Sequence, residues 1–178
     1  MVASLPLNRQ KWEAYRTWRG EQTYFSMKIY ERTVDRYARL YPLLREEPRF
    51  LFEYGQCLAK TGRYGESSRI LKEAVSLSGD PMFYNILGKN EQALGRPAEA
   101  ARYFLRAARI VPNRMYPLYL LACLYWDTGQ VQQAREVTLQ LLQKEPKVMS
   151  EAVREMKKEG RRRLDEAEEM TSWPEFIP

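Results

Sequence analysis

The sequence predicts an all-α protein, a right-handed solenoid of helical hairpins stacked into an α-α superhelix. Three glycines, Gly62, Gly95 and Gly129, recur 33 and 34 residues apart, each between two stretches with helical spacing of apolar residues. A period of this size indicates repeated helix–turn–helix units. We expect each glycine to end the first helix of its unit, because a left-handed backbone there is free of strain only without a Cβ atom.

Three consecutive segments carry the repeated pattern: residues 48–80, 81–114 and 115–148. Each has a small residue where its two helices must approach closely, in turn Gly55, Gly88 and Ala122. Further small residues leave room for large side chains of the neighbouring helix: Ala74, Ala100, Ala107 and Ala134. Pro112 and Pro146 close the second and third segments, because the proline ring cannot continue a helix. This order resembles the tetratricopeptide repeat (TPR), so we expect about three TPRs.

The flanking segments follow the pattern less closely. Residues 1–47 have helical spacing and predict a divergent N-terminal helical hairpin, which Gly20 could divide into its two helices. Residues 149–170 predict a C-terminal capping helix with Ser150 as its N-cap. Residues 171–178 contain two prolines and no period, which predicts a flexible tail.

Composition argues against several classes of function. The chain has 178 residues, no His and two Cys, so neither a metal site nor a bound cofactor is expected. Cys57 and Cys123 are expected to be small buried hydrophobic residues and not a disulfide. No apolar run approaches the roughly 18 residues of a membrane span. The sequence shows no phosphate-binding Gly-rich loop and no nucleophile beside a base, so we expect no catalysis by this chain.

The formal net charge of +6 is spread along the chain, which argues against nucleic acid as a partner. The densest basic run is Lys157–Arg163, and Gly160 within it is expected to weaken the helix. One interpretation of the run is a solvated helix face, balanced by the acidic residues Asp165, Glu166, Glu168 and Glu169. The other is a contact with anionic lipid headgroups or phosphate.

The first helix of each TPR hairpin lines a concave groove, so its inward positions form the predicted binding site. These positions hold Arg49, Phe52, Gln56 and Lys60, then Met82, Asn85, Lys89 and Gln92, then Tyr116, Tyr119, Trp126 and Asp127, with Ala59, Ala93 and Cys123 among them. Because Tyr and Trp are frequent in interfaces, we expect a protein partner (a peptide or helix) or a glycan in this groove. The alternative is that the terminal helices cover several of these aromatic residues, which then belong to the core.

Four phrases of the sequence carry a closer resemblance: Phe50–Gly55, Asp80–Asn90, Ala93–Gly95 and Val111–Leu121. They resemble the C-terminal TPR region of Bacteroidetes proteins of the O-antigen ligase family, and the likeness extends over residues 12–159. The resemblance implies a preceding polytopic membrane domain that transfers or polymerises lipid-linked glycans in lipopolysaccharide biosynthesis. It places the present segment on the periplasmic face of the inner membrane. The family's catalytic residues, a His among them, belong to the membrane part, so none is carried over to this chain.

Two functions therefore follow from the sequence. The first is an accessory, non-catalytic periplasmic domain of an O-antigen ligase-like protein, which contacts the membrane only through its upstream domain. The second is a free-standing TPR adaptor that binds a peptide or helix. If the chain is complete, the lack of a recognisable leader at Met1 favours the cytoplasm for this adaptor.

Overall fold

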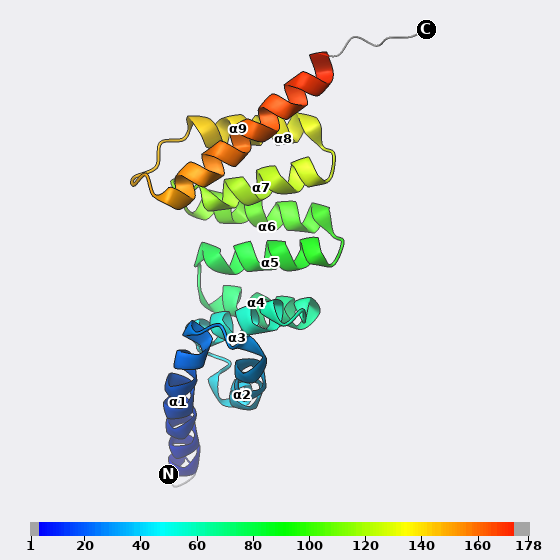
Figure 1. Ribbon diagram of the computed structural model, residues 1–178. Coiled ribbons are helices and arrows are strands. Elements are labelled where there is room, and N and C mark those ends of the chain that lie inside the picture. Colours follow the sequence, from blue (N-terminus) through cyan, green and yellow to red (C-terminus); the bar gives the residue numbers. More distant parts are fainter. Residues whose placement is uncertain (1–3, 173–178) are drawn as a thin grey trace. The chain divides into compact units, whose positions relative to one another are not determined.

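The computed structural model describes residues 4–172, and its elements are all helical (Figure 1). Nine helices and no strand occur in the described residues. The chain divides into two compact units, Met1–Arg96 and Pro97–Pro178, and buried apolar residues fill each of them. The predicted all-α class is confirmed.

The first unit contains five helices: α1 (Ser4–Ser26), α2 (Tyr30–Leu44), α3 (Pro48–Lys60), α4 (Tyr64–Leu77) and α5 (Pro81–Ala93). Each helix packs on the next, and α3 also contacts α1 and α5. This is the arrangement of stacked helical hairpins, in which the first helices of successive hairpins touch. Large residues such as Tyr37, Phe50 and Leu71 are fully buried between the helices.

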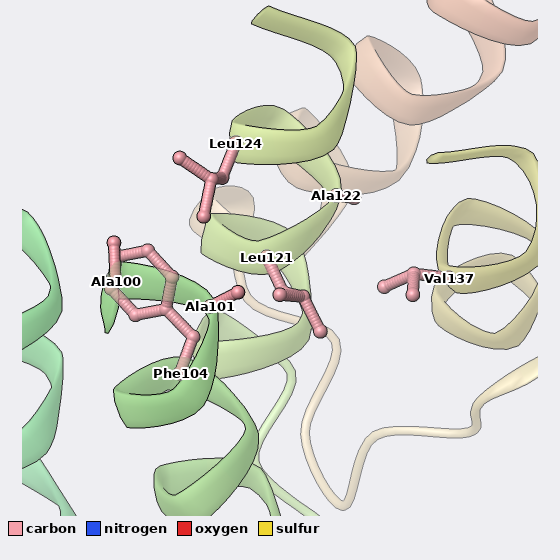
Figure 2. Packing of buried hydrophobic residues seen from close by; sticks show 7 residues of the cluster. All are labelled: Ala100, Ala101, Phe104, Leu121, Ala122, Leu124 and Val137. Atoms are coloured by element: carbon pink, nitrogen blue, oxygen red, sulfur yellow. The ribbon is translucent and has the colours of Figure 1, made fainter. Parts of the chain in front are cut away.

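The second unit contains four helices: α6 (Pro97–Ile110), α7 (Tyr116–Asp127), α8 (Val131–Gln143) and α9 (Glu151–Ser172). The helix α9 contacts both α7 and α8, and Figure 1 shows its orange and red ribbon lying across them. Figure 2 shows how Phe104 of α6, Leu121 and Leu124 of α7 and Val137 of α8 come together in one apolar cluster. Three of these four side chains are almost completely buried, so this cluster is the core of the unit.

Three helix ends have the geometry that the repeated glycines predict. Gly62, Gly95 and Gly129 have φ angles of 77°, 72° and 70° and follow the ends of α3, α5 and α7. The Gly62 N–H donates to the carbonyl three residues back at 3.2 Å, and the N–H of Arg63 donates to the carbonyl of Leu58 at 2.8 Å. This pair of bonds is a Schellman motif, and α5 and α7 end in the same way. The prediction for the three glycines is confirmed.

Two other glycines stand where helices approach closely. A Cβ atom on Gly55 would lie 2.6 Å from Cγ of Leu71, so any larger residue would force Leu71 or the two helices to shift, in agreement with the predicted close approach. A Cβ atom on Gly160 would lie 3.1 Å from Cγ2 of Thr138. Gly160, expected only to weaken its helix, is therefore the point at which α9 crosses α8.

The structure corrects the boundaries of the flanking helices. Gly20 does not divide the N-terminal segment, because α1 continues through it and ends at Ser26. The chain reverses at Lys28, whose φ of 62° makes it a left-handed residue other than glycine. Ser150 caps α9 by accepting the N–H of Val153 at 3.3 Å, as expected. The helix continues through residue 172, and the remainder of the predicted tail, 173–178, lies outside the described residues.

The two cysteines are free thiols, as expected. Cys57 is fully buried and Cys123 is partly buried. Burial raises the pKa of the Cys57 thiol to about 12, so it stays protonated and unreactive at neutral pH.

Candidate functional site

The predicted residues of α3 form one stripe along the helix, because their spacing of three or four residues returns them to the same face. Arg49 and Lys60 are exposed at its two ends, and Phe52 and Gln56 between them are half-buried. The Phe52 ring meets the Phe83 ring of α5 edge to face, with centroids 5.5 Å apart. This stripe therefore offers an aromatic surface between two cations.

The predicted residues of α5 differ more in exposure. Lys89 and Gln92 are exposed, Met82 is half-buried and Asn85 is buried. The Asn85 amide nitrogen lies 3.8 Å from the sulfur of Met82, and its Oδ1 has no hydrogen-bond partner among the described residues. Asn85 is thus an interior residue and not an open contact point.

A buried carboxylate lies beneath the α3 stripe. Glu53 is 4% exposed and accepts hydrogen bonds from Trp18 Nε1 at 2.8 Å, Tyr37 Oη at 2.9 Å and Gln22 Nε2 at 3.0 Å. Arg49 Nε donates to the same carboxylate at 3.3 Å. These bonds join α1, α2 and α3, and the bond to Arg49 holds its guanidinium against α3. Burial, and then the Glu53 charge, raise the pKa of Tyr37 well above its usual value, so Tyr37 donates at every physiological pH.

The carboxylate of Glu91 occupies a similar interior position on α5. It is 3% exposed and accepts from Ser68 Oγ of α4 and from Arg96 Nη1, both at 3.1 Å. Beside it, Asn90 Nδ2 donates to Ser67 Oγ at 2.8 Å. Neither Glu53 nor Glu91 is among the site residues predicted from the sequence. The available signal was that each is the one acidic residue of its helix, at a position beside a residue that the repeat buries.

The four predicted residues of α7 lie in the second unit, and two of them, Trp126 and Asp127, lie beside α9. Asp127 Oδ1 accepts from Arg163 Nη1 of α9 at 2.8 Å. Trp126 Nε1 donates to Thr138 Oγ1 of α8 at 3.0 Å. Burial, and then a hydrogen bond with Cys123, raise the pKa of Tyr119 to about 12. These three side chains are therefore engaged within the unit.

Part of Trp126 remains open at the edge of α9. A pocket of about 300 Å³ lies there, and its lining combines apolar and charged side chains: Trp126, Val131, Arg162, Arg163, Glu166, Ala167 and Met170. Tyr116 is partly buried near the start of α7. Of the α7 set, Trp126 thus keeps a defined cavity beside it.

No group of His, Cys, Asp and Glu residues able to hold a metal ion occurs in residues 4–172. None of the helices described is long and apolar enough to cross a membrane.

Comparison with known proteins identifies the repeats. The sequence profile of the tetratricopeptide repeat matches residues 48–81 and 117–146, which correspond to α3–α4 and α7–α8. These two segments are TPRs. A search of the curated proteins gives no match.

Solved TPR proteins share the fold. YrrB, described as a TPR protein with an unusual peptide-binding site, aligns with a TM-score of 0.65 and 16% identity over 94% of this chain and 91% of its own. A thermophilic TPR protein of Thermus thermophilus aligns with a TM-score of 0.66 and 18% identity over 86% of each chain. MamA of Desulfovibrio magneticus RS-1 aligns with a TM-score of 0.62 and 16% identity over 75% of this chain and 70% of its own. At these identities the likeness shows the fold.

Proposed function

We propose that this chain, a tetratricopeptide-repeat protein by its repeats and its fold, is a non-catalytic docking module that binds an acidic protein segment on the face of α3 and α5. The proposal rests on where the charged side chains of these two helices lie. All three of their cations, Arg49, Lys60 and Lys89, are exposed, whereas both of their carboxylates, Glu53 and Glu91, are buried. Glu53 neutralises part of the Arg49 charge through their contact at 3.3 Å, so the outward positive charge of the face comes mainly from Lys60 and Lys89.

An apolar anchor lies between the cations. Phe52 is half-buried against Phe83, and Met82, which precedes Phe83 on α5, is also half-buried. A partly exposed aromatic ring, backed by a second ring, is a surface on which a partner's apolar side chain gains contact area at little cost in entropy. The hydrogen bonds of Glu53 hold α3 on α1 and α2, which keeps this surface preorganised.

A protein partner fits this chain better than a glycan. Sugar rings stack on open aromatic faces, and the aromatic side chains predicted for that purpose lie on α7. Of these, Trp126 is tied to Thr138 of α8 and opens onto a pocket that charged side chains of α9 line, and Tyr119 is partly buried. Basic side chains around a half-buried ring instead suit a peptide or helix that carries carboxylates on both sides of an apolar residue.

The proposal is tested with a fluorescent peptide of Asp and Glu residues that has one central Phe. We expect saturable binding to the full chain and no binding of the matched peptide in which Lys replaces the acidic residues. Phe52→Ala should cost about 2 kcal/mol, and Lys60→Gln about 0.5–1 kcal/mol. Lys72→Gln on α4 removes an exposed cation away from the face and is the control.

Equal loss of affinity in Lys60→Gln and Lys72→Gln would show that only net charge matters. Since Phe52 packs on Phe83, the Phe52→Ala variant must first be shown to melt cooperatively. Retention of full affinity by this folded variant would remove Phe52 as the anchor.

We further propose that this module is the periplasmic C-terminal part of an O-antigen ligase-like membrane protein, with the resemblance of the phrases Phe50–Gly55 and Asp80–Asn90 as support. The second candidate is a free-standing cytoplasmic TPR adaptor with the same binding face. The gene distinguishes the two. An in-frame extension upstream with several apolar spans of about 20 residues supports the first, and its absence supports the second.

A further inference from the structure

The second unit carries a basic surface that the proposed docking face does not use. It is formed by the α8–α9 loop, residues 144–150, and by the first half of α9. A pocket of about 530 Å³ opens on it. Its lining contains five cations, one carboxylate and one apolar side chain: Arg154, Lys157, Lys158, Arg161, Arg162, Asp165 and Met149.

Two of these cations are already engaged. Lys157 Nζ donates to the carbonyls of Leu142 and Lys144 at 2.8 and 2.7 Å, and so caps the end of α8. Arg162 pairs with Glu159 and with Glu166, its neighbours on the helix. The structural role of these two residues explains only part of the basic run.

The remaining cations are available. Lys158 and Arg161 are exposed, and neither has an ion-pair partner in the part of the chain that the structure describes. Arg154 donates to the carbonyl of Met149 at 3.3 Å, which holds the loop against the helix while the rest of the guanidinium stays exposed. Positions 154, 158 and 161 follow one another on one face of α9.

Apolar side chains stand beside these cations. Val148 is 74% exposed and Met149 is 49% exposed in the loop that leads into α9. Val148 follows Lys147, which is also exposed. Aliphatic side chains gain nothing in water, but they gain free energy when they enter the boundary between headgroups and acyl chains.

We propose that the α8–α9 loop and the basic face of α9 form a peripheral binding surface for anionic bilayers. Arg154, Lys158 and Arg161 bind the headgroup phosphates, and Val148 and Met149 enter the interface. A bilayer is the occupant that presents phosphates and an apolar layer side by side. A soluble phosphate compound would use the cations and leave Val148 and Met149 exposed.

The test measures co-sedimentation of the full chain with vesicles of phosphatidylcholine and phosphatidylglycerol in equal parts, and with vesicles of phosphatidylcholine alone. We expect binding to the first and not to the second, with loss of binding at high salt. The double variant Lys158→Gln/Arg161→Gln should bind about 25-fold more weakly, at about fivefold for each cation. The control Lys72→Gln/Arg39→Gln makes the same change of net charge at exposed positions of α4 and α2 and should bind like the parent.

Two further variants remove the remaining ambiguities. Asp165→Asn should strengthen binding about fivefold, a gain that a misfolded variant cannot give. Val148→Ser/Met149→Ser should weaken vesicle binding about tenfold and leave the affinity for soluble inositol hexakisphosphate unchanged. If this variant binds vesicles like the parent, the ligand is free phosphate and the proposal fails. Equal binding to both kinds of vesicle, or equal loss in the two double variants, would also overturn it.

Discussion

Replacement of Glu53 by alanine should destabilise the first unit strongly. The substitution removes the acceptor of two almost completely buried donors, Trp18 Nε1 and Tyr37 Oη, which lie 2.8 and 2.9 Å from it. Each buried donor left without a partner costs about 1–3 kcal/mol, so together with the bond from Gln22 we expect a loss of about 3–5 kcal/mol. Glu53→Gln keeps the side-chain volume and one acceptor oxygen, so this variant should lose about half as much stability as Glu53→Ala.

The assay is urea unfolding with linear extrapolation, followed by tryptophan fluorescence and by the indole N–H resonance of Trp18. Glu66→Ala is the matched control, because Glu66 makes an exposed ion pair with Arg63 and its removal should cost less than about 0.5–1 kcal/mol. The expected order of loss is Glu53→Ala, then Glu53→Gln, then the control. If Glu53→Ala unfolds like the control, the buried carboxylate does not hold α1 and α2 on α3.

Three other predictions concern the helix ends and α9. Gly95→Val should lower the free energy of unfolding by about 1–3 kcal/mol, because a side chain strains the backbone at its φ of 72°. A steric clash does not contribute, since no atom lies within 4 Å of the added Cβ. Gly79→Val, equally open but without a positive φ, is the control, and equal melting of the two would refute the backbone argument. Gly160→Leu should cost about 1–3 kcal/mol by pushing α9 from Thr138, and a variant as stable as the parent would show that the crossing is loose. Hydrogen bonds from two arginines of α9 lower the pKa of Glu159 from 4.5 to about 2. Its carboxylate therefore stabilises the fold above pH 4.5, and this contribution is lost as the pH falls towards 2. The stability difference between the parent and Glu159→Gln should shrink over this range, and a difference independent of pH would contradict the assignment.

The repeat and its turns could be read from the sequence because they depend on local chemistry. A residue with positive φ after a helix selects glycine, so the spacing of Gly62, Gly95 and Gly129 marks the three helix ends directly. The close approach at Gly55 follows from the same repeat. The prediction that Gly20 could end a helix was wrong, because a helix tolerates an exposed glycine at a modest cost. Gly20 has no neighbour within 4 Å of an added Cβ, so neither a turn nor a close contact requires a glycine there.

The candidate site could be predicted only in part, because it depends on contacts between distant segments. The bond between Trp18 and Glu53 joins residues 35 positions apart, and no repeat period encodes it. The contact of Arg163 with Asp127 spans 36 positions and sets α9 beside α7. Periodicity therefore placed the stripe of Arg49 and Phe52 on one helix face, but not the buried carboxylate beneath it.

The central claim is that an acidic segment docks on α3 and α5. Amide hydrogen exchange of the full chain, with and without the acidic peptide that carries one Phe, tests it most directly. We expect slower exchange in α3 and α5 on addition of the peptide, and no change in α9 or in residues 144–150. Protection confined to α9, or no protection anywhere at a saturating peptide concentration, would contradict it.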